Sequence, residues 1–492
     1  MPGFAEIFTN IGRYLVYDPE APMLFSSGTF WALFIVFMPL YGLLRSRVLQ
    51  MSAFVVAFSL FFYYKCSGWF ALLLVSTSLV DWMLSQAMNT EGATRAFRRG
   101  CMVLSLLASL SVLAFFKYAN FFLWNFHAMV GGNFQPLDLV LPVGISFYTF
   151  QSVSYIIDVY RKKVQPARTW LEYAFFLSFF PALVAGPIVR ADYFLPQIRQ
   201  NRHATAAEVY TGLWLIIIGV LKKAVIADYI AQYNDLVFDA PGAYCGFEAL
   251  MGIIGYAMQI YCDFSGYSDM AVGIALMMGF RLAQNFDFPY KASNISDFWH
   301  RWHISLSTWL RDYIYIPLGG NRKGKGRMYV NLMLTMLIGG LWHGAAWKYV
   351  LWGGVHGVGL AAHKAAAPVL ARVPDSVFMR FAGWFFTTAF VVLLWVFFRA
   401  GSATDALTII GSVGRGFSLG QINAFAASRM LWLILMAVIV AAHFLPSDFR
   451  ERSAQWFVRT PWMIKLIVFI LTVQCVLELR SADVMPFIYF QF

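Results

Sequence analysis

Charged residues are scarce in this sequence, and the scarcity excludes an ordinary soluble domain. Only 13% of the 492 residues are charged and 60% are hydrophobic, whereas soluble domains carry roughly a quarter charged residues. Many apolar runs are long enough for membrane-spanning helices, each of which needs about 20 residues. We therefore predict an all-α polytopic membrane protein with roughly 11–13 transmembrane helices.

Several motifs that would assign other functions are missing. The five cysteines show no CxxC spacing, so neither a metal site nor a disulfide framework is indicated. The GxxxxGK[ST] spacing of a nucleotide-binding P-loop is absent, as is the GxSxG elbow of serine hydrolases. The chain also has no convincing internal repeat, which argues against a secondary transporter built from two related halves.

Long polar linkers are missing as well, so nothing indicates a separate soluble domain. We expect residues 24–492 to form one transmembrane domain that ends in an aromatic tail at 485–492. Residues 1–23 lack the apolar core of a cleavable signal peptide. Apolar residues at helical spacing make this extension either an amphipathic helix on the membrane surface or a disordered tail.

Basic residues outnumber acidic ones, and the formal net charge is +12. They gather in short loops, a pattern that indicates membrane topology and contact with anionic lipids rather than nucleic-acid binding. One such loop carries Arg322, Lys323, Lys325 and Arg327. Short basic loops favour the cytoplasmic side of the membrane.

The most polar stretch beyond the first apolar run covers residues 281–322. We predict that a helix begins there near Ile295, capped by Ser293 or Ser296, and continues to about Tyr315. Such a helix is too polar to face lipid. It should lie at the membrane interface or enter the protein as a re-entrant element.

The predicted helix carries His300 and His303, which are three residues apart and would share a face. Histidine can be tuned for proton transfer near neutral pH. Arg311 and Asp312 add polar groups toward the end of the same helix. The alternative is a set of interfacial side chains that bind lipid headgroups or other loops.

His343 is the sharper candidate, because it ends an apolar run and is flanked by Gly339, Gly340 and Gly344. Small residues let another helix or a substrate approach the backbone closely. A helix that begins near Tyr329 would place His343 roughly 21 Å along its axis, at or beyond the bilayer centre if the basic loop is cytoplasmic. A hydrogen-bonded core histidine is the alternative.

Two carboxylates, Asp263 and Asp269, interrupt another apolar run. Gly266 between them suggests a broken helix. Buried carboxylates in membrane proteins usually pair with Arg or Lys, and we favour structural pairing over contact with a substrate or acyl donor.

Four segments together resemble the membrane-bound O-acyltransferase family, and more closely its bacterial branch active in alginate O-acetylation. They are LPVGISFYTFQSVSYIIDVYR from Leu141, YCDFSGYSDMAVGIALMMGF from Tyr261, FWHRWHISLSTWLRDYIYIPLGGNR from Phe298, and LTMLIGGLWHG, which ends at Gly344. The resemblance runs from about Leu24 to the C-terminus. It implies a ring of tilted transmembrane helices, with re-entrant or interfacial helices, around a thin central funnel.

The resemblance also implies roles for particular residues. The family's principal catalytic histidine maps onto His343, and its second functional position maps onto His303. At the position of His300 the family often has Arg. The chain's end, MPFIYFQF, is similar to a terminal motif in which a tyrosine carries the acyl group, which makes Tyr489 a candidate carrier; an aromatic anchor at the interface is the alternative.

The function implied is an O-acetyltransferase of the bacterial inner membrane. Acetyl-CoA would be the donor substrate, no cofactor would be bound permanently, and Arg322, Lys323, Lys325 and Arg327 could attract the donor's phosphates. A periplasmic or membrane-anchored hydrolase-like acetyltransferase would complete transfer to an exported polysaccharide. The acceptor stays open among alginate, cellulose, peptidoglycan and other glycans, and an acyl group other than acetyl or an acyl carrier protein donor is also compatible.

Two alternatives come from other functional classes. A proton-coupled transporter or flippase could use His303, His343 and Asp263 as a proton relay. A non-catalytic membrane scaffold for an exopolysaccharide complex is the third possibility.

Overall fold

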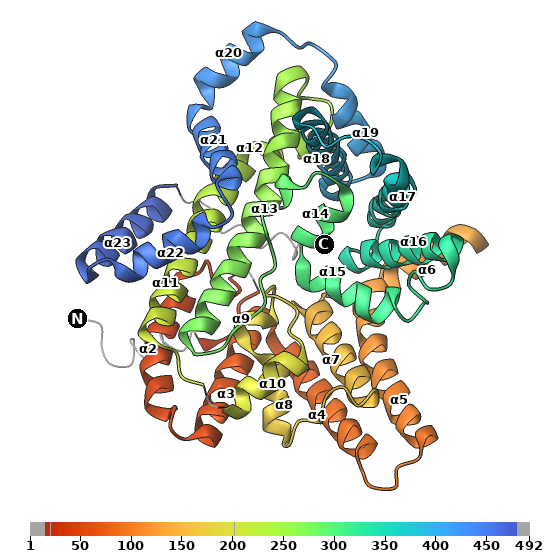
Figure 1. Ribbon diagram of the computed structural model, residues 1–492, viewed down its shortest axis with the longest axis vertical. Coiled ribbons are helices and arrows are strands. Elements are labelled where there is room, and N and C mark those ends of the chain that lie inside the picture. Colours follow the sequence, from red (N-terminus) through yellow and green to blue (C-terminus); the bar gives the residue numbers. More distant parts are fainter. Residues whose placement is uncertain (1–14, 20, 201, 480–492) are drawn as a thin grey trace. The chain divides into compact units, whose positions relative to one another are not determined.

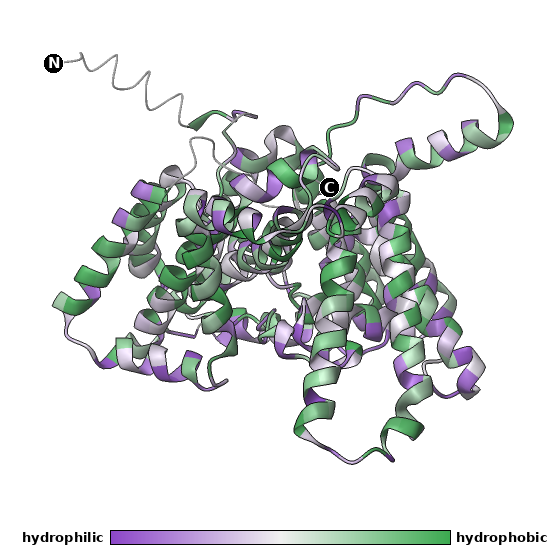
Figure 2. Cartoon of the chain, turned by 90° about the horizontal axis from the view of Figure 1, so that it is seen from above, coloured by the Kyte–Doolittle hydropathy of each residue, from purple (hydrophilic) through white to green (hydrophobic). Residues whose placement is uncertain are grey.

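The computed structural model describes residues 15–19, 21–200 and 202–479, and in these residues every regular element is a helix. Figure 2 shows apolar residues along most of the length of the long helices, with hydrophilic residues gathered at helix ends and connecting loops. The all-α membrane architecture predicted from the composition is therefore confirmed.

The chain divides into two compact units. It passes between them within α11 (Ala206–Val220), within α13 (Gly246–Met277) and between Ala283 and Gln284. The first unit comprises Met1–Gly212 and Met270–Ala283. Its other helices, labelled in Figure 1, are α2 (Gly28–Leu44), α3 (Val48–Ser67), α4 (Ala71–Met88), α5 (Arg95–Leu113), α6 (Ala119–Val130), α7 (Ile145–Tyr160), α8 (Trp170–Ser178), α9 (Phe180–Leu183) and α10 (Ala191–Gln200).

The second unit comprises Leu213–Asp269 and Gln284–Phe492. Its other helices are α12 (Asp228–Asp239), α14 (Ile295–Arg301), α15 (Ile304–Leu310), α16 (Gly324–His343), α17 (Trp347–Leu370), α18 (Val377–Arg399), α19 (Ala403–Ser412), α20 (Leu419–Ser428), α21 (Met430–Phe444), α22 (Phe449–Arg459) and α23 (Trp462–Leu479).

Five helical stretches in the described residues are long and apolar enough to cross a membrane, or six when the bent pair α20–α21 counts as one span. The sequence suggested roughly 11–13 spans from apolar runs of about 20 residues. Several of those runs form helices that are shorter, bent or more polar than a simple span. The α20–α21 pair, for example, bends by 92°.

A buried carboxylate joins four helices of the first unit. Asp81 on α4 is fully buried and accepts hydrogen bonds from Ser105 on α5 at 2.5 Å, Ser152 on α7 at 2.6 Å and Tyr173 on α8 at 2.9 Å. A buried polar group is tolerated when such partners satisfy it. Asp81 is therefore a structural link between these helices.

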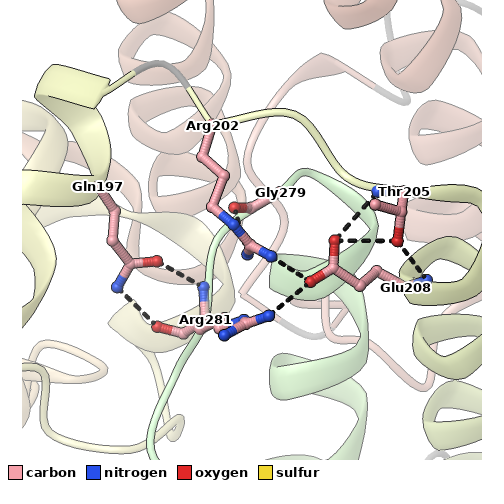
Figure 3. Close-up of polar contacts among 6 residues, drawn as sticks. All are labelled: Gln197, Arg202, Thr205, Glu208, Gly279 and Arg281. Atoms are coloured by element: carbon pink, nitrogen blue, oxygen red, sulfur yellow. Dashed lines mark hydrogen bonds and ion pairs between the residues drawn. The ribbon is translucent and has the colours of Figure 1, made fainter.

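A second polar cluster of the first unit fixes the segment that follows α13 (Figure 3). Gln197 exchanges two hydrogen bonds with the backbone of Arg281, at 2.8 and 3.1 Å. Glu208 accepts from the guanidinium groups of Arg202 and Arg281, and Arg202 also donates to the carbonyl of Gly279. Gly279 has φ +92°, a conformation that ends a helix and that glycine adopts readily.

Candidate active site

The predicted helix from Ile295 to Tyr315 is broken in the structure, and this prediction was wrong. Helix α14 ends at Arg301, Trp302 is extended, and His303 has the left-handed dihedrals φ 43° and ψ 55° before α15 begins. A non-glycine residue at positive φ is uncommon. The start at Ile295 is as predicted, but Asn294 is the cap, since its side chain accepts from the backbone N–H of Asp297 at 2.9 Å.

The break separates the two histidines that were expected to share a face. His300 is exposed, whereas His303 is fully buried. The Oγ of Ser307, one turn further on, donates to the carbonyl of Trp302. Asp297 and Arg301, which both lie on α14, form an ion pair at 2.9 Å.

His303 lies in an aromatic setting with one amide contact. Its ring is 4.7 Å from that of Phe264 at 88° and 5.9 Å from that of Trp342 at 65°. Its Nδ1 lies 3.2 Å from Oδ1 of Asn285. Burial lowers the pKa of His303 well below the usual histidine value, so the imidazole is neutral at physiological pH.

His343 is the last residue of α16 and is also buried. Its ring contacts those of Trp342 at 5.0 Å, Trp352 at 5.1 Å and Phe398 at 5.2 Å, each at a steep angle. The aromatic rings exclude water from its surroundings, which strengthens electrostatic interactions with any group that reacts there.

Both histidines therefore contact the ring of one residue, Trp342, although they are far apart in the sequence. His303 comes from the α14–α15 junction and His343 from the end of α16. The structure brings together the two positions that were chosen from the sequence as the strongest catalytic candidates.

The glycines around His343 let α16 and α17 cross at close range. A Cβ on Gly340 would lie 2.2 Å from the carbonyl oxygen of Tyr349 and 3.1 Å from Cα of Gly353. A Cβ on Gly344 would lie 2.1 Å from the Tyr349 ring. The sequence analysis expected these small residues to admit either another helix or a substrate, and in the structure they admit helix α17.

A cavity of about 270 Å³ lies beside α15, the helix that begins directly after His303. Its polar wall includes His300 and Arg311, and Lys364 on α17 adds a second permanent cation. The remaining lining residues are Ser296, Trp299, Ile304, Ser307, Thr308, Leu310, Tyr315, Leu332, Thr335, Met336 and Leu360. Lys364, which follows His363 on α17, was not among the residues chosen from the sequence.

The basic residues Arg322, Lys323, Lys325 and Arg327 are all exposed, and none of them lines this cavity. The Arg322 guanidinium donates to the carbonyl of Ile316 at 3.4 Å. Arg311 forms an ion pair with Asp312 at 2.8 Å. Of the predicted polar residues in this region, the structure thus places only His300 and Arg311 at the cavity.

Asp263 and Asp269 pair with cations, as favoured from the sequence. Asp263 lies 2.5 Å from Lys223, while Asp269 lies 2.8 Å from Lys222 and 2.7 Å from Arg450. The expected helix break between them was wrong, because α13 is continuous. Gly266 serves close packing instead: a Cβ there would lie 2.7 Å from the carbonyl oxygen of Gly219.

A third histidine, His356 on α17, is fully buried among aromatic rings. Its ring lies 4.6 Å from Trp352 and 5.1 Å from Trp299. Tyr489 and the aromatic tail lie outside the described residues, as do residues 1–14 of the N-terminal extension.

Comparison with known proteins identifies the family of this chain. Residues 104–402 match the model of the membrane-bound O-acyltransferase family. A probable alginate O-acetylase, AlgI, of Pseudomonas putida is 36% identical over 498 residues, which cover 96% of this chain and 100% of that protein. The probable alginate O-acetylase AlgI of Pseudomonas aeruginosa is 41% identical over 449 residues, or 88% of this chain and 83% of the relative.

A relative with a different acceptor in its name is also similar. The peptidoglycan O-acetyltransferase of Helicobacter pylori is 38% identical over 397 residues, which cover 75% of each chain. The match to the family model and the near-complete alignment with its members show that this chain is an acyltransferase of the membrane-bound O-acyltransferase family, similar to AlgI.

Proposed function

We propose that the chain is an inner-membrane O-acetyltransferase that moves acetyl groups from a cytoplasmic thioester toward an exported polysaccharide. The observation that carries the proposal is the convergence of His303 and His343 on the ring of Trp342, within a water-poor aromatic cluster. The names of the relatives, alginate O-acetylase and peptidoglycan O-acetyltransferase, support acetyl transfer to a glycan.

In the proposed reaction, His343 is the general base. It takes the proton of the acceptor hydroxyl while the hydroxyl oxygen attacks the carbonyl carbon of the thioester. The new C–O bond forms and the C–S bond breaks, and the proton on His343 then passes to the departing thiolate. The products are the O-acetyl ester and the free thiol.

The cavity beside α15 is the proposed donor site. Arg311 and Lys364 supply positive charge at its wall, suited to a phosphate-bearing donor such as acetyl-CoA. His303, directly before Ile304 in this wall, would contact the thioester end of the donor. The exposed loop with Arg322, Lys323, Lys325 and Arg327 would raise the local donor concentration electrostatically without touching the bound donor.

The proposal extends to partners and to the C-terminal tail. A periplasmic or membrane-anchored hydrolase-like acetyltransferase would accept the acetyl group and transfer it to sugar hydroxyls. Tyr489 would carry the acetyl group as an intermediate ester. Its phenolic oxygen would displace the thiolate of the donor, and it would itself be displaced when the partner accepts the acetyl group. The alternative of a proton relay through Asp263 has less support, because that carboxylate lies 2.5 Å from the buried Lys223 ammonium.

Proteoliposomes loaded with radiolabelled acetyl-CoA test the proposal. With the donor presented at one face and the hydrolase-like partner plus an acceptor glycan at the other, label should appear in the glycan as an alkali-labile ester. Thiol release should match ester formation one for one. Net passage of solute or protons without thioester cleavage would instead support the transporter.

A further inference from the structure

The turn that carries His303 is held by a residue outside the histidine helices, Asn285. Four of its contacts reach this turn. Its backbone carbonyl accepts from the N–H of Ile304 at 2.9 Å. Its side-chain Oδ1 accepts from the backbone N–H of Ser305 at 3.2 Å and from the Ser305 hydroxyl at 2.9 Å, and lies 3.2 Å from Nδ1 of His303.

Asn285 thereby does for α15 what a cap residue normally does. A helix cap supplies a side-chain oxygen to one of the first free N–H groups of the helix. The cap position of α15 is occupied by His303, whose own side chain makes no capping hydrogen bond. The imidazole is consequently directed elsewhere, toward the rings of Phe264 and Trp342.

The same contacts determine which nitrogen of His303 carries its proton. The backbone N–H of Ser305 can only donate, so the Asn285 atom that faces it is the oxygen and not the amide nitrogen. The amide nitrogen then points the other way, where it donates to Ser268 at 3.4 Å. Because an amide oxygen only accepts, Nδ1 of His303 must be the donor in its contact with Asn285.

A neutral imidazole has one N–H, so a proton on Nδ1 leaves the lone pair on Nε2. We propose that Asn285 is a positioning residue that holds His303 in the Nδ1–H tautomer. Nε2 is then a hydrogen-bond and proton acceptor on the side of the proposed acyl-donor site. This inference rests on the function proposed for His303. It adds a definite role: Nε2 receives a hydrogen bond or proton rather than donating one to the thioester carbonyl.

Burial supports the assignment of a specific tautomer. Asn285, His303, Ser305 and Ser268 are each at most 5% exposed, so water does not compete for these hydrogen bonds. The left-handed backbone of His303 costs free energy, and the four contacts from Asn285 offset that cost. Such strain is typical of functional positions.

The direct test is nitrogen NMR of the full-length protein in lipid nanodiscs with ¹⁵N-labelled histidine. The His303 signal is assigned as the one that disappears in His303→Gln. The proposal expects a protonated Nδ1 and an unprotonated Nε2 at neutral pH. A protonated Nε2 with a bare Nδ1 would overturn it, and this readout does not depend on whether the enzyme turns over.

Substitutions of Asn285 separate positioning from folding. Asn285→Asp keeps an acceptor oxygen for both α15 and Nδ1, so Nδ1 should remain protonated; an unprotonated Nδ1 in this variant would contradict the proposal. Asn285→Ala should abolish the Nδ1–H signature and lower the kcat of acetyl-CoA cleavage by roughly 10- to 100-fold, at most the lower end of the roughly 10²- to 10⁴-fold that a positioned acid–base group contributes. An unchanged tautomer in Asn285→Ala would also overturn the proposal.

Ser305→Ala is the matched control, because it removes one donor to the same oxygen and leaves the His303 contact intact. It should retain both the tautomer and most of the kcat. If His303→Gln cleaves acetyl-CoA at the wild-type rate, the function proposed for His303 fails, while the tautomer measurement still decides whether Asn285 positions the ring.

Discussion

Gly340 of α16 and Gly353 of α17 face each other so closely that a Cβ on Gly340 would lie 3.1 Å from the Cα of Gly353. Their contact sets the distance between the helix that ends in His343 and the helix that packs Trp352 against it. A side chain on either glycine would force the two backbones apart, since little free space remains between packed helices.

Gly340→Ala is therefore expected to lower both stability and transfer activity. Overpacking of this kind costs about 1–3 kcal/mol, and the displaced helix would carry His343 with it. Thermal unfolding in detergent and the rate of acetyl-CoA cleavage are the two measurements. Gly326→Ala on the same helix is the control, because a Cβ there meets nothing within 4 Å; equal effects of both variants would contradict the packing argument.

Asp81 should be essential for the stability of the first unit. Asp81→Ala leaves the three donors on Ser105, Ser152 and Tyr173 without their buried acceptor, at roughly 1–3 kcal/mol for each unsatisfied group. The unfolding temperature of Asp81→Ala in detergent should lie clearly below that of the wild type. Asp81→Asn retains one acceptor oxygen, so its unfolding temperature should lie between those of Asp81→Ala and the wild type. A fully stable Asp81→Ala protein would show that the helices do not depend on this link.

The cavity and the basic loop should affect donor binding in different ways. Arg311→Gln combined with Lys364→Gln is expected to raise the KM for acetyl-CoA roughly tenfold or more, since charge-assisted hydrogen bonds contribute about 1.5–3 kcal/mol each. Arg311 and Lys364 are exposed, but a donor bound in the cavity would cover both side chains, so part of the effect should persist at high salt. The KM is measured at several ionic strengths with thiol release as the signal.

Neutralising Arg322, Lys323, Lys325 and Arg327 together should raise this KM only at low salt. Exposed charges act over a Debye length of about 10 Å at 0.1 M salt and are screened beyond it. If the loop variant instead loses donor binding at every salt concentration, and the cavity variant does not, the donor site lies at the loop.

Tyr489 is expected to carry an acetyl ester during turnover. Mass spectrometry of the C-terminal peptide, after rapid quenching with acetyl-CoA present, should find a mass increase on Tyr489 that disappears when the acceptor is added. Tyr489→Phe keeps the aromatic ring but removes the hydroxyl, and it should abolish glycan acetylation. Full acetylation by that variant would reject the carrier role.

The sequence predicted the membrane class from a simple pattern, and the same pattern drew attention to His343, whereas His303 was chosen from the polar stretch at 281–322 and from the family resemblance. Apolar runs report burial in lipid directly, and ionisable residues inside them are rare enough to stand out. The ion pairs of Asp263 and Asp269 were predicted on the same basis.

The features that the sequence did not reveal depend on contacts between distant segments. The break at His303 requires hydrogen bonds from Asn285, which precedes it by more than one element. Local spacing therefore favoured a continuous helix through His303. Local spacing also favoured a helix break at Gly266, but this glycine instead allows the backbone of Gly219 to pack closely. Asn285 lay in the unusual polar stretch at 281–322, and this was the one signal that could have identified it.

The most direct test of the account is the rate of acetyl transfer in His343→Gln, compared with His356→Gln. Both histidines are buried and both contact Trp352, so the pair separates chemistry from packing in the same aromatic cluster. We predict that His343→Gln loses transfer by roughly 100-fold or more while folded protein remains, and that His356→Gln retains transfer in proportion to its folded fraction. Wild-type transfer by folded His343→Gln would contradict the assignment of His343 as the general base.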